Sequence, residues 1–377
     1  MTELDSHSQP NSPLLCAPLE VRRAIYAHFD SQLHMFLLQG AVRLSPCLQP
    51  NLGDNNHAGH ERRYPEEGAA EVVWARRLDS SWGPHWECEE LAFATDDKPQ
   101  NNPIYKLLFV CKRMFLEICD FVAERSVINI TDLDTLDASL PKSGGLGSAL
   151  GQPWSLFDLI SPRIHNLNVT LRLPIAFYKA VETGDIKETA VDRPNIAKSI
   201  AYNNDWIQFW SNICSLQGLH NLHVWLDHDH ESSWSEVKER PVLDPVFAIL
   251  AREMQSRSSR CTGQHAQVLF NLPKLHPGIA TPDTHFIEGT APPLFTLQRR
   301  YRQRYHSQES PTGTSRVVGK ADFPVMWELT LDENPDGPYM TLEEVEIYER
   351  GLWERGLDPT RELLEINGHM CFEQGYI

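Results

Sequence analysis

The sequence predicts an α/β fold, with α+β as the alternative, in which N-terminal helices precede irregular βα units. Strand-like and helix-like segments alternate through the second half of the chain. In addition, the pattern apolar-x-x-Leu-x-Val-x-Leu occurs at Ile164–Leu171 and again at Leu219–Leu226, 55 positions later. With 377 residues, of which 41% are hydrophobic, the chain is long enough to bury one large core or two ordinary ones.

The N-terminal region begins with a polar segment, residues 1–12, which we interpret as a disordered tail. A helix is predicted from Pro18 to Phe29, because proline is favoured in the first turn of a helix. Its apolar positions recur at helical spacing and include Val21, Ala24, Ile25 and Phe29, with Arg22 and Arg23 outside this stripe.

Residues from about 45 to 100 lose this periodicity and contain clusters of turn-forming residues, so they are predicted to form a long, loop-rich insertion. The insertion contains Trp74, Trp82 and Trp86. Because large aromatic side chains are poorly tolerated when fully exposed, we expect part of it to pack on the body of the protein or on a partner.

Helical order returns at Ile104–Glu124, and Val127–Ile130 is then typical of a strand. The glycine-rich residues 143–152 predict a linker, with a domain boundary near residue 145. Residues 13–142 are therefore assigned to an N-terminal helical module that carries the insertion.

Residues 153–335 are predicted to form the βα region. In the two repeated strands, Leu167, Val169 and Leu171 share one face, as do Leu222, Val224 and Leu226. Helices are predicted at Asp205–Ile213, Asp244–Met254 and Pro293–Tyr305, and further strands at Val268–Leu272 and Val325–Leu331. Both an ordinary parallel sheet and a leucine-rich-repeat-like stack fit this alternation. Residues 336–377 are expected to form a final helix and tail, with Thr341 and Glu344 in a capping box.

Composition narrows the classes of function. The formal net charge of −17 disfavours nucleic acid as a partner, and the arginines near Tyr301 and Tyr305 (Arg299, Arg300, Arg302 and Arg304) are interpreted as a solvated helix face. No apolar stretch approaches the roughly 20 residues that a membrane span requires. The N-terminus lacks the pattern of a secretory signal. We therefore expect a cytoplasmic or nuclear protein without a membrane or nucleic-acid partner.

The eight cysteines are scattered and form no CxxC pair, so the sequence indicates neither a zinc cage nor a disulfide framework, and no cofactor is predicted. One group is typical of metal ligands: His223, Asp227, His228, Asp229 and His230 at a strand end. A metal-dependent hydrolase that uses the His223–His230 segment is therefore an alternative. No GxSxG, P-loop or GxGxxG motif occurs, and we predict a non-enzymatic protein.

Two segments carry a family resemblance. The run SPLLCAPLEVRRAIY, Ser12–Tyr26, resembles the opening LLxLPxEIRxxIY of a large group of uncharacterised fungal F-box-like proteins. The run LFVCKRMFLE, Leu108–Glu117, is similar to the second hallmark of that group, LLxTCRxIYxE. The similarity covers Pro13 to about Ile130.

The resemblance implies an N-terminal module related to the F-box, which in well-understood relatives docks on the Skp-type adaptor of cullin ubiquitin ligases. A downstream region would then select a substrate. An apolar surface for such a partner would comprise Leu14, Leu15, Pro18, Val21, Ile25 and Phe29, and the same residues equally suit the protein's own core. A structural family member without conserved activity is a third possibility.

Overall fold

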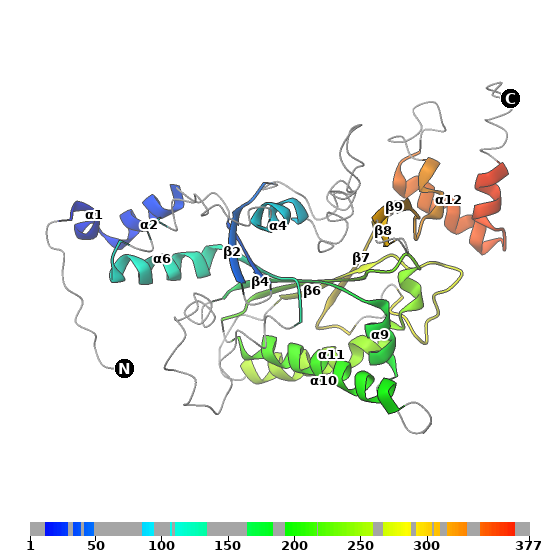
Figure 1. Ribbon diagram of the computed structural model, residues 1–377, viewed down its shortest axis with the longest axis horizontal. Helices are drawn as coiled ribbons and strands as arrows, with labels where there is room; N and C mark the ends of the chain where they lie inside the picture. The colour runs from blue at the N-terminus through cyan, green and yellow to red at the C-terminus, as the bar shows by residue number, and fades with distance from the viewer. Residues whose placement is uncertain are drawn as a thin grey trace.

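The computed structural model describes residues 12–28, 33–38, 41–48, 85–93, 106–107, 110–133, 164–183, 193–216, 218–258, 267–287, 292–303, 305–309, 315–329 and 340–365. Its centre is a seven-stranded sheet in the order β2-β1-β3-β4-β5-β6-β7 (Figure 1). The β1–β2 pair is antiparallel and every other pair in this sheet is parallel. The predicted α/β class is therefore confirmed.

The N-terminal part supplies helices and three strands of the sheet. Two short helices come first, a β-hairpin and a small helix follow, and a longer helix then precedes the third strand. The elements are α1 (Pro13–Cys16), α2 (Leu19–His28), β1 (Leu33–Leu38), β2 (Ala41–Pro46), α4 (Trp86–Phe93), α6 (Lys112–Arg125) and β3 (Val127–Ile130). Because β3 pairs with β4, strands from both sides of the predicted linker at 143–152 belong to one sheet. The linker itself lies outside the described residues.

The second half alternates strands and helices before it ends in a small hairpin and helix. Its elements are β4 (Asn166–Leu173), α9 (Ile175–Glu182), α10 (Arg193–Ser215), β5 (Asn221–His228), η3 (Trp234–Glu236), α11 (Glu239–Ser258), β6 (Gln267–Pro273), β7 (Thr296–Arg300), β8 (Tyr305–Glu309), β9 (Ser315–Gly319), η4 (Val325–Leu329) and α12 (Leu342–Glu354).

The repeated motif forms adjacent strands in register. Leu167 pairs with Leu222, Val169 with Val224 and Leu171 with Leu226. All six side chains are buried, as the period-2 pattern predicts. The repeat therefore reflects two parallel neighbours that bury equivalent residues against the same layer of helices.

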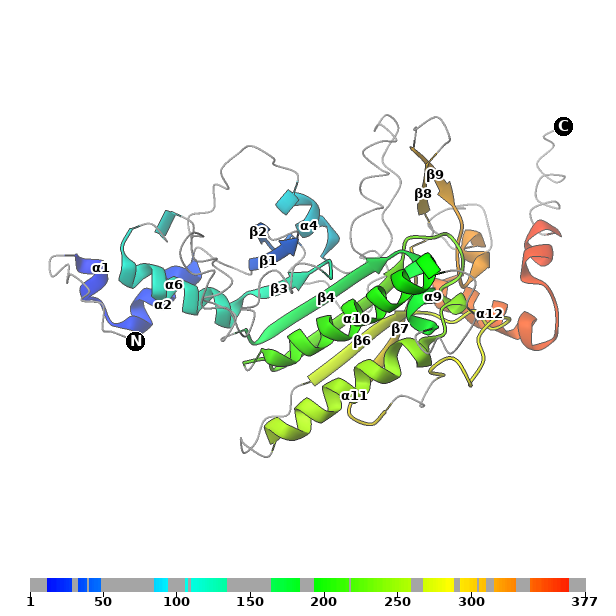
Figure 2. The same cartoon turned by 60° about the horizontal axis from the view of Figure 1, so that its bottom comes forward.

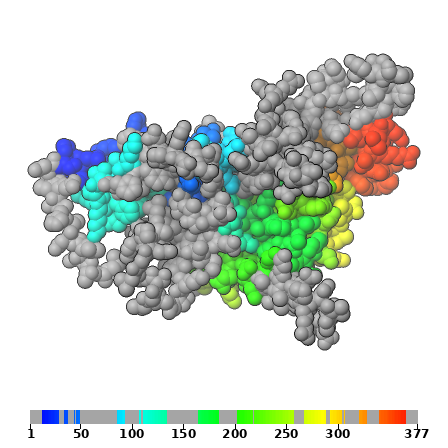
Figure 3. All heavy atoms as spheres, viewed as in Figure 1, coloured from blue at the N-terminus to red at the C-terminus, as the bar shows by residue number. Residues whose placement is uncertain are grey.

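Helices α9, α10 and α11 cover one face of the sheet, below it in Figure 1 and in front of it in Figure 2. Their tryptophans and phenylalanines fill this core, and Trp206 of α10 donates a hydrogen bond from its indole nitrogen to the Val242 carbonyl of α11 at 3.0 Å. The opposite face of the central strands carries polar side chains that include Asn168, Asn221 and Asn271. Helix α4 lies on that side, near β1 and β2 (Figure 1). Figure 3 shows α1, α2 and α6 at one end of the molecule and α12 at the other.

Two predicted elements are wrong. The helix predicted at Pro293–Tyr305 contains strand β7, because the free edge of β6 supplies backbone partners from Leu269 to Pro273. The strand predicted at Val325–Leu331 begins as the 3₁₀ helix η4, where the Met326 N–H donates to the Glu349 carboxylate of α12 at 2.9 Å. In both segments a partner distant in sequence determines the backbone conformation.

The arginines near Tyr301 do not form a solvated helix face. Arg300 and Arg302 are buried, and Arg299 binds the buried carboxylate of Glu239 with Nη1 and Nη2 at 2.6 and 2.8 Å. Arg304 lies outside the described residues.

The predicted insertion also contains structure, since α4 buries Trp86, whereas Trp74 and Trp82 lie outside the described residues.

Candidate functional site

Helix α2 is attached to α6 by a buried ion pair. Arg22 is 2% exposed and donates from Nε and Nη2 to the two carboxylate oxygens of Glu117, at 2.7 and 2.6 Å. The Tyr26 hydroxyl donates to the same carboxylate at 3.2 Å. Arg22 also donates to the carbonyl oxygens of Leu15 and Ala17, so one guanidinium joins α1, α2 and α6.

The electrostatics of this contact favour the charged pair. Burial alone would raise the pKa of Glu117, but hydrogen bonds from Arg22 and Arg113 hold that pKa below its ordinary value. The hydrogen bond from Arg22 to Glu117 raises the pKa of the guanidinium. Burial raises the pKa of Tyr26 to about 12, so this phenol remains a hydrogen-bond donor at neutral pH.

The six residues predicted to bind a partner are divided by the structure. Leu15 is buried, Leu14 and Ile25 are half-buried, and Pro18 and Val21 are exposed. Phe29 lies outside the described residues. The apolar stripe predicted along this helix was therefore wrong in its orientation, because Arg22 and Tyr26 occupy the buried side and Ala24 is exposed.

This orientation leaves an exposed apolar set at the start of α2, which we call the α2 outer surface: Pro18, Leu19 and Val21. Leu19 is 40% exposed and Val21 is 48% exposed. Leu19 and Val21 are two positions apart, so they project from different sides of the helix, and the three residues surround its first turn without sharing one face.

The His223–His230 segment does not converge on one point. His223 lines a pocket on the polar face of the sheet, whereas the His228 ring stacks on Trp234 at a centroid distance of 5.9 Å. Asp229 is exposed and accepts a hydrogen bond from the Ile175 N–H at the start of α9, at 3.2 Å. His230 is also exposed. These positions give the metal-dependent hydrolase no support.

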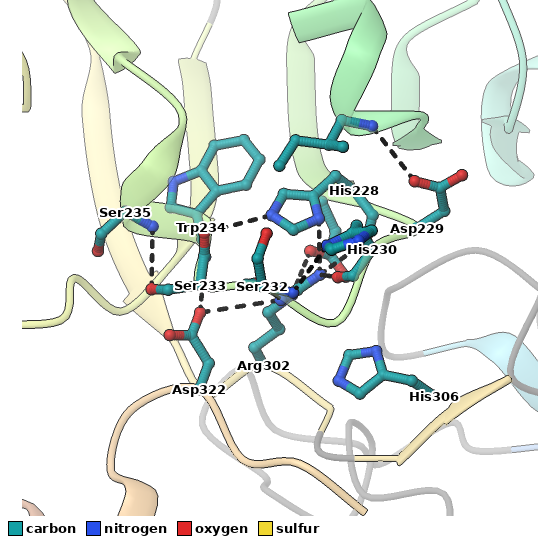
Figure 4. Close-up of polar contacts among 12 residues, drawn as sticks. His228, Asp229, His230, Ser232, Ser233, Trp234, Ser235, Arg302, His306 and Asp322 are labelled. Atoms are coloured by element: carbon teal, nitrogen blue, oxygen red, sulfur yellow. Dashed lines mark hydrogen bonds and ion pairs between the residues drawn. The ribbon is translucent and has the colours of Figure 1, made fainter. Parts of the chain in front are cut away.

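Arg302 occupies the centre of this region (Figure 4). Its Nε donates to Asp227 Oδ1 at 2.6 Å, and its other nitrogens donate to the carbonyl oxygens of His228, His230 and Ser232. His228 Nδ1 accepts from Arg302 Nη2 at 2.9 Å. The guanidinium therefore fixes the loop after β5.

Burial determines the protonation of this network. Burial, followed by the charge of Arg302, lowers the pKa of His228 to about 3. Burial opposes ionisation of Asp227, but Arg302 and its neighbours hold the pKa of that carboxyl below its ordinary value. Asp322, which accepts from the Trp234 N–H at 2.8 Å, has its pKa raised by burial. The side chains of Asp227, His228, Arg302 and Asp322 therefore form a buried structural network.

The polar face of the sheet contains a pocket of about 250 Å³ whose lining is rich in asparagine. The Asn221 amide donates to Asn166 Oδ1 at 2.7 Å across two strands, and Arg300 Nε donates to Asn271 Oδ1 at 2.9 Å. The Arg300 guanidinium also lies over the Trp225 ring, 5.5 Å from its centroid. Amide, guanidinium and aromatic groups of this kind can hydrogen-bond to a polar ligand and stack on it.

A second cluster, which sequence reasoning missed, combines His34 of β1, Cys47 after β2, His85 before α4 and Cys88 within α4. One ligand atom from each lies within 4.8 Å of all the others, and this is the one such group of metal-binding side chains within the described ranges. The sequence contains a signal for half of it, the His-x-x-Cys spacing of His85 and Cys88. His34 and Cys47 belong to a hairpin that the prediction did not contain.

No protein-family model matches the chain, and the comparisons with curated proteins and with solved structures returned no match. Across the segments that the structure describes, every helix is too short or too polar to cross a membrane. Functional inferences therefore depend on this chain's own residues.

Proposed function

We propose that this chain is a non-enzymatic protein-interaction protein, an F-box-like substrate receptor of a cullin ubiquitin ligase, whose α2 outer surface binds a Skp-type adaptor. The observation that carries the proposal is the orientation of α2. Arg22 and Tyr26 attach this helix to α6, and Leu19 and Val21 remain exposed.

The exposed residues have the chemistry of interface anchors. Burying a fully exposed valine or leucine side chain contributes about 1.5–3 kcal/mol, and Leu19 and Val21, which are 40% and 48% exposed, would gain roughly half of that. The backbone that carries them is held in place by the Arg22–Glu117 ion pair, so little ordering is required on binding. A partner that covers the first turn of α2 would therefore contact both Leu19 and Val21.

The asparagine-rich pocket is the corresponding candidate for substrate binding. It lies on the polar face of the sheet, and its lining combines hydrogen-bonding amides with Trp225 and Arg300. A substrate segment in extended conformation could hydrogen-bond to these amides through its own backbone. One molecule would then carry separate adaptor and substrate surfaces.

An affinity purification from a fungal lysate tests the proposal, with the full-length chain as bait. The informative variant is Leu19→Asp combined with Val21→Asp, since both side chains are exposed and the fold should tolerate the change. Leu15 is not a suitable probe, because it is buried and its substitution would disturb the fold. Ile347→Asp on α12 is the matched control, because Ile347 is 71% exposed and distant in sequence.

We expect a Skp-type adaptor and a cullin to co-purify with the wild-type chain and with Ile347→Asp, and to be lost from the double variant. Circular dichroism should show the same helix content in all three proteins. Absence of both ligase subunits from the folded wild-type bait would contradict the proposal. Equal recovery by the double variant would contradict the role of the α2 outer surface.

A further inference from the structure

Three separate segments meet where β1, β2 and α4 pack together. His34 lies on β1 and Cys47 follows the last residue of β2. His85 precedes α4, and Cys88 lies in its first turn. His34 and Cys88 are buried, and Cys47 and His85 are half-buried. Two imidazoles and two thiols form the ligand set of a closed Cys₂His₂ zinc site.

The distances agree with one shared ion. In a tetrahedral zinc site, bonds of about 2.0 Å to nitrogen and 2.3 Å to sulfur place neighbouring ligand atoms roughly 3.3–3.8 Å apart. His85 Nδ1 lies 3.6 Å from Cys47 Sγ and 3.8 Å from Cys88 Sγ. The His34 and His85 ring centroids are 4.2 Å apart. A zinc ion therefore fits between these side chains after small rotations.

Groups around the cluster are placed to orient its ligands. The Leu48 N–H donates to Cys88 Sγ at 3.3 Å, a bond that stabilises a thiolate. The side-chain amide nitrogen of Asn129 on β3 lies 3.2 Å from His34 Nδ1, so the His34 ring contacts β3 beside the cluster. The backbone N–H of Leu48 is thus placed to hold one of the sulfur ligands in position.

The apolar contact between the β1–β2 hairpin and α4 is small. The buried apolar cluster here comprises Phe36, Cys88 and Ala92, with Cys47 packed against it. Helix α4 has eight residues, and isolated helices of this length are marginal in water. A bound metal ion would add a second link between α4 and the hairpin, which is itself part of the seven-stranded sheet.

We propose that His34, Cys47, His85 and Cys88 bind one structural Zn²⁺ ion that joins the β1–β2 hairpin to α4. Four protein ligands complete a tetrahedral zinc site and leave no position for a substrate, so the ion is structural and not catalytic. The thiols bind as thiolates, and their two protons pass to the buffer. His85 also lines the asparagine-rich pocket, so the zinc unit supports one wall of that pocket.

Metal analysis of the full-length chain, purified with a tag that contains no histidine, tests this assignment. We expect one equivalent of zinc per chain, and its loss in Cys47→Ser and in Cys88→Ser. Cys16→Ser is the matched control, because Cys16 is exposed on α1 and outside the cluster. His85→Cys should retain the ion, because it replaces one zinc ligand with another.

Cobalt titration of the metal-free wild-type chain gives a second readout that does not depend on the folding of any variant. Stoichiometric Co²⁺ should produce the intense visible bands of a tetrahedral site together with thiolate-to-cobalt charge transfer, and Zn²⁺ should abolish both. Zinc at background level with no cobalt spectrum would overturn the proposal. Equal zinc loss in Cys16→Ser and Cys88→Ser would also overturn it.

Discussion

His228 illustrates how burial changes the chemistry of a single residue. In sequence it stands among five polar residues that are typical of metal ligands, yet its ring packs against Trp234 and accepts a hydrogen bond from Arg302. The groups that face it are Arg302, Asp227, His230 and the Ser233 carbonyl. Its imidazole is therefore held neutral inside a structural network.

This burial makes the stability of the fold depend on pH. The pKa of His228 is about 3 in the folded chain, against an ordinary value of 6.5 in the unfolded chain. Between these two pH values the unfolded chain binds a proton that the folded chain does not. The stabilisation is complete above pH 6.5 and is lost as the pH falls towards 3. At pH 4.5 the loss is about 3 kcal/mol for this ring.

Urea unfolding between pH 4.5 and 7.5 measures this dependence in the wild type and in His228→Gln. The free energy of unfolding should fall less steeply with decreasing pH in the variant, by up to one bound proton. His230→Gln is the matched control, because His230 is exposed two residues later. Parallel curves for the wild type and His228→Gln would contradict the account of this network.

At the residue scale, the sequence alone predicted which strand residues are buried but not which ligands meet. Leu167, Val169 and Leu171 are identifiable because alternation determines the face of a strand. His34 and Cys47 are not identifiable as ligands, because they meet His85 only after the hairpin pairs and α4 packs on it. The spacing of these residues along the sequence does not show that they come together in the fold.

At the scale of elements, local sequence signals predicted the limits of helices and strands where the chain contains such signals. The Thr341–Glu344 capping box begins α12 as predicted, and β3 has the predicted limits, Val127–Ile130. The face of α2 could not be predicted from apolar spacing, because its buried side contains Arg22, whose charge is compensated by Glu117 of α6. The β7 strand was missed because its partner, β6, lies more than twenty positions earlier.

The contact between α2 and α6 allows a direct measurement of its strength. We expect Glu117→Gln to reduce the free energy of unfolding by about 3 kcal/mol, because it leaves the buried Arg22 guanidinium without its counter-charge. Chemical denaturation of the full-length chain at neutral pH gives this value.

The exposed pair between the same helices provides the control. Arg23 and Glu124 lie 3.0 Å apart with side chains 38% and 39% exposed, and Glu124→Gln should cost less than about 1 kcal/mol. Similar costs for Glu117→Gln and Glu124→Gln would show that the buried pair does not hold α2 in place.

At the scale of the whole molecule, one sheet connects the N-terminal helices to the rest of the chain. The strands β1, β3, β4, β5, β6 and β7 follow one another in sequence order, with α9, α10 and α11 on one face. The opposite face of the central strands carries the asparagine-rich pocket. The alternation of strands and helices predicted the class of fold. It did not predict the number of strands, because the β1–β2 hairpin has little local sequence signal.

The central claim is that the α2 outer surface binds a Skp-type adaptor, and calorimetric titration with the purified adaptor tests it most directly. We expect saturable binding by the full-length wild-type chain and by Ile347→Asp. Leu19→Asp combined with Val21→Asp should weaken binding at least tenfold, equivalent to about 1.4 kcal/mol. No binding by the folded wild-type chain, or equal affinity in the double variant, would contradict the claim.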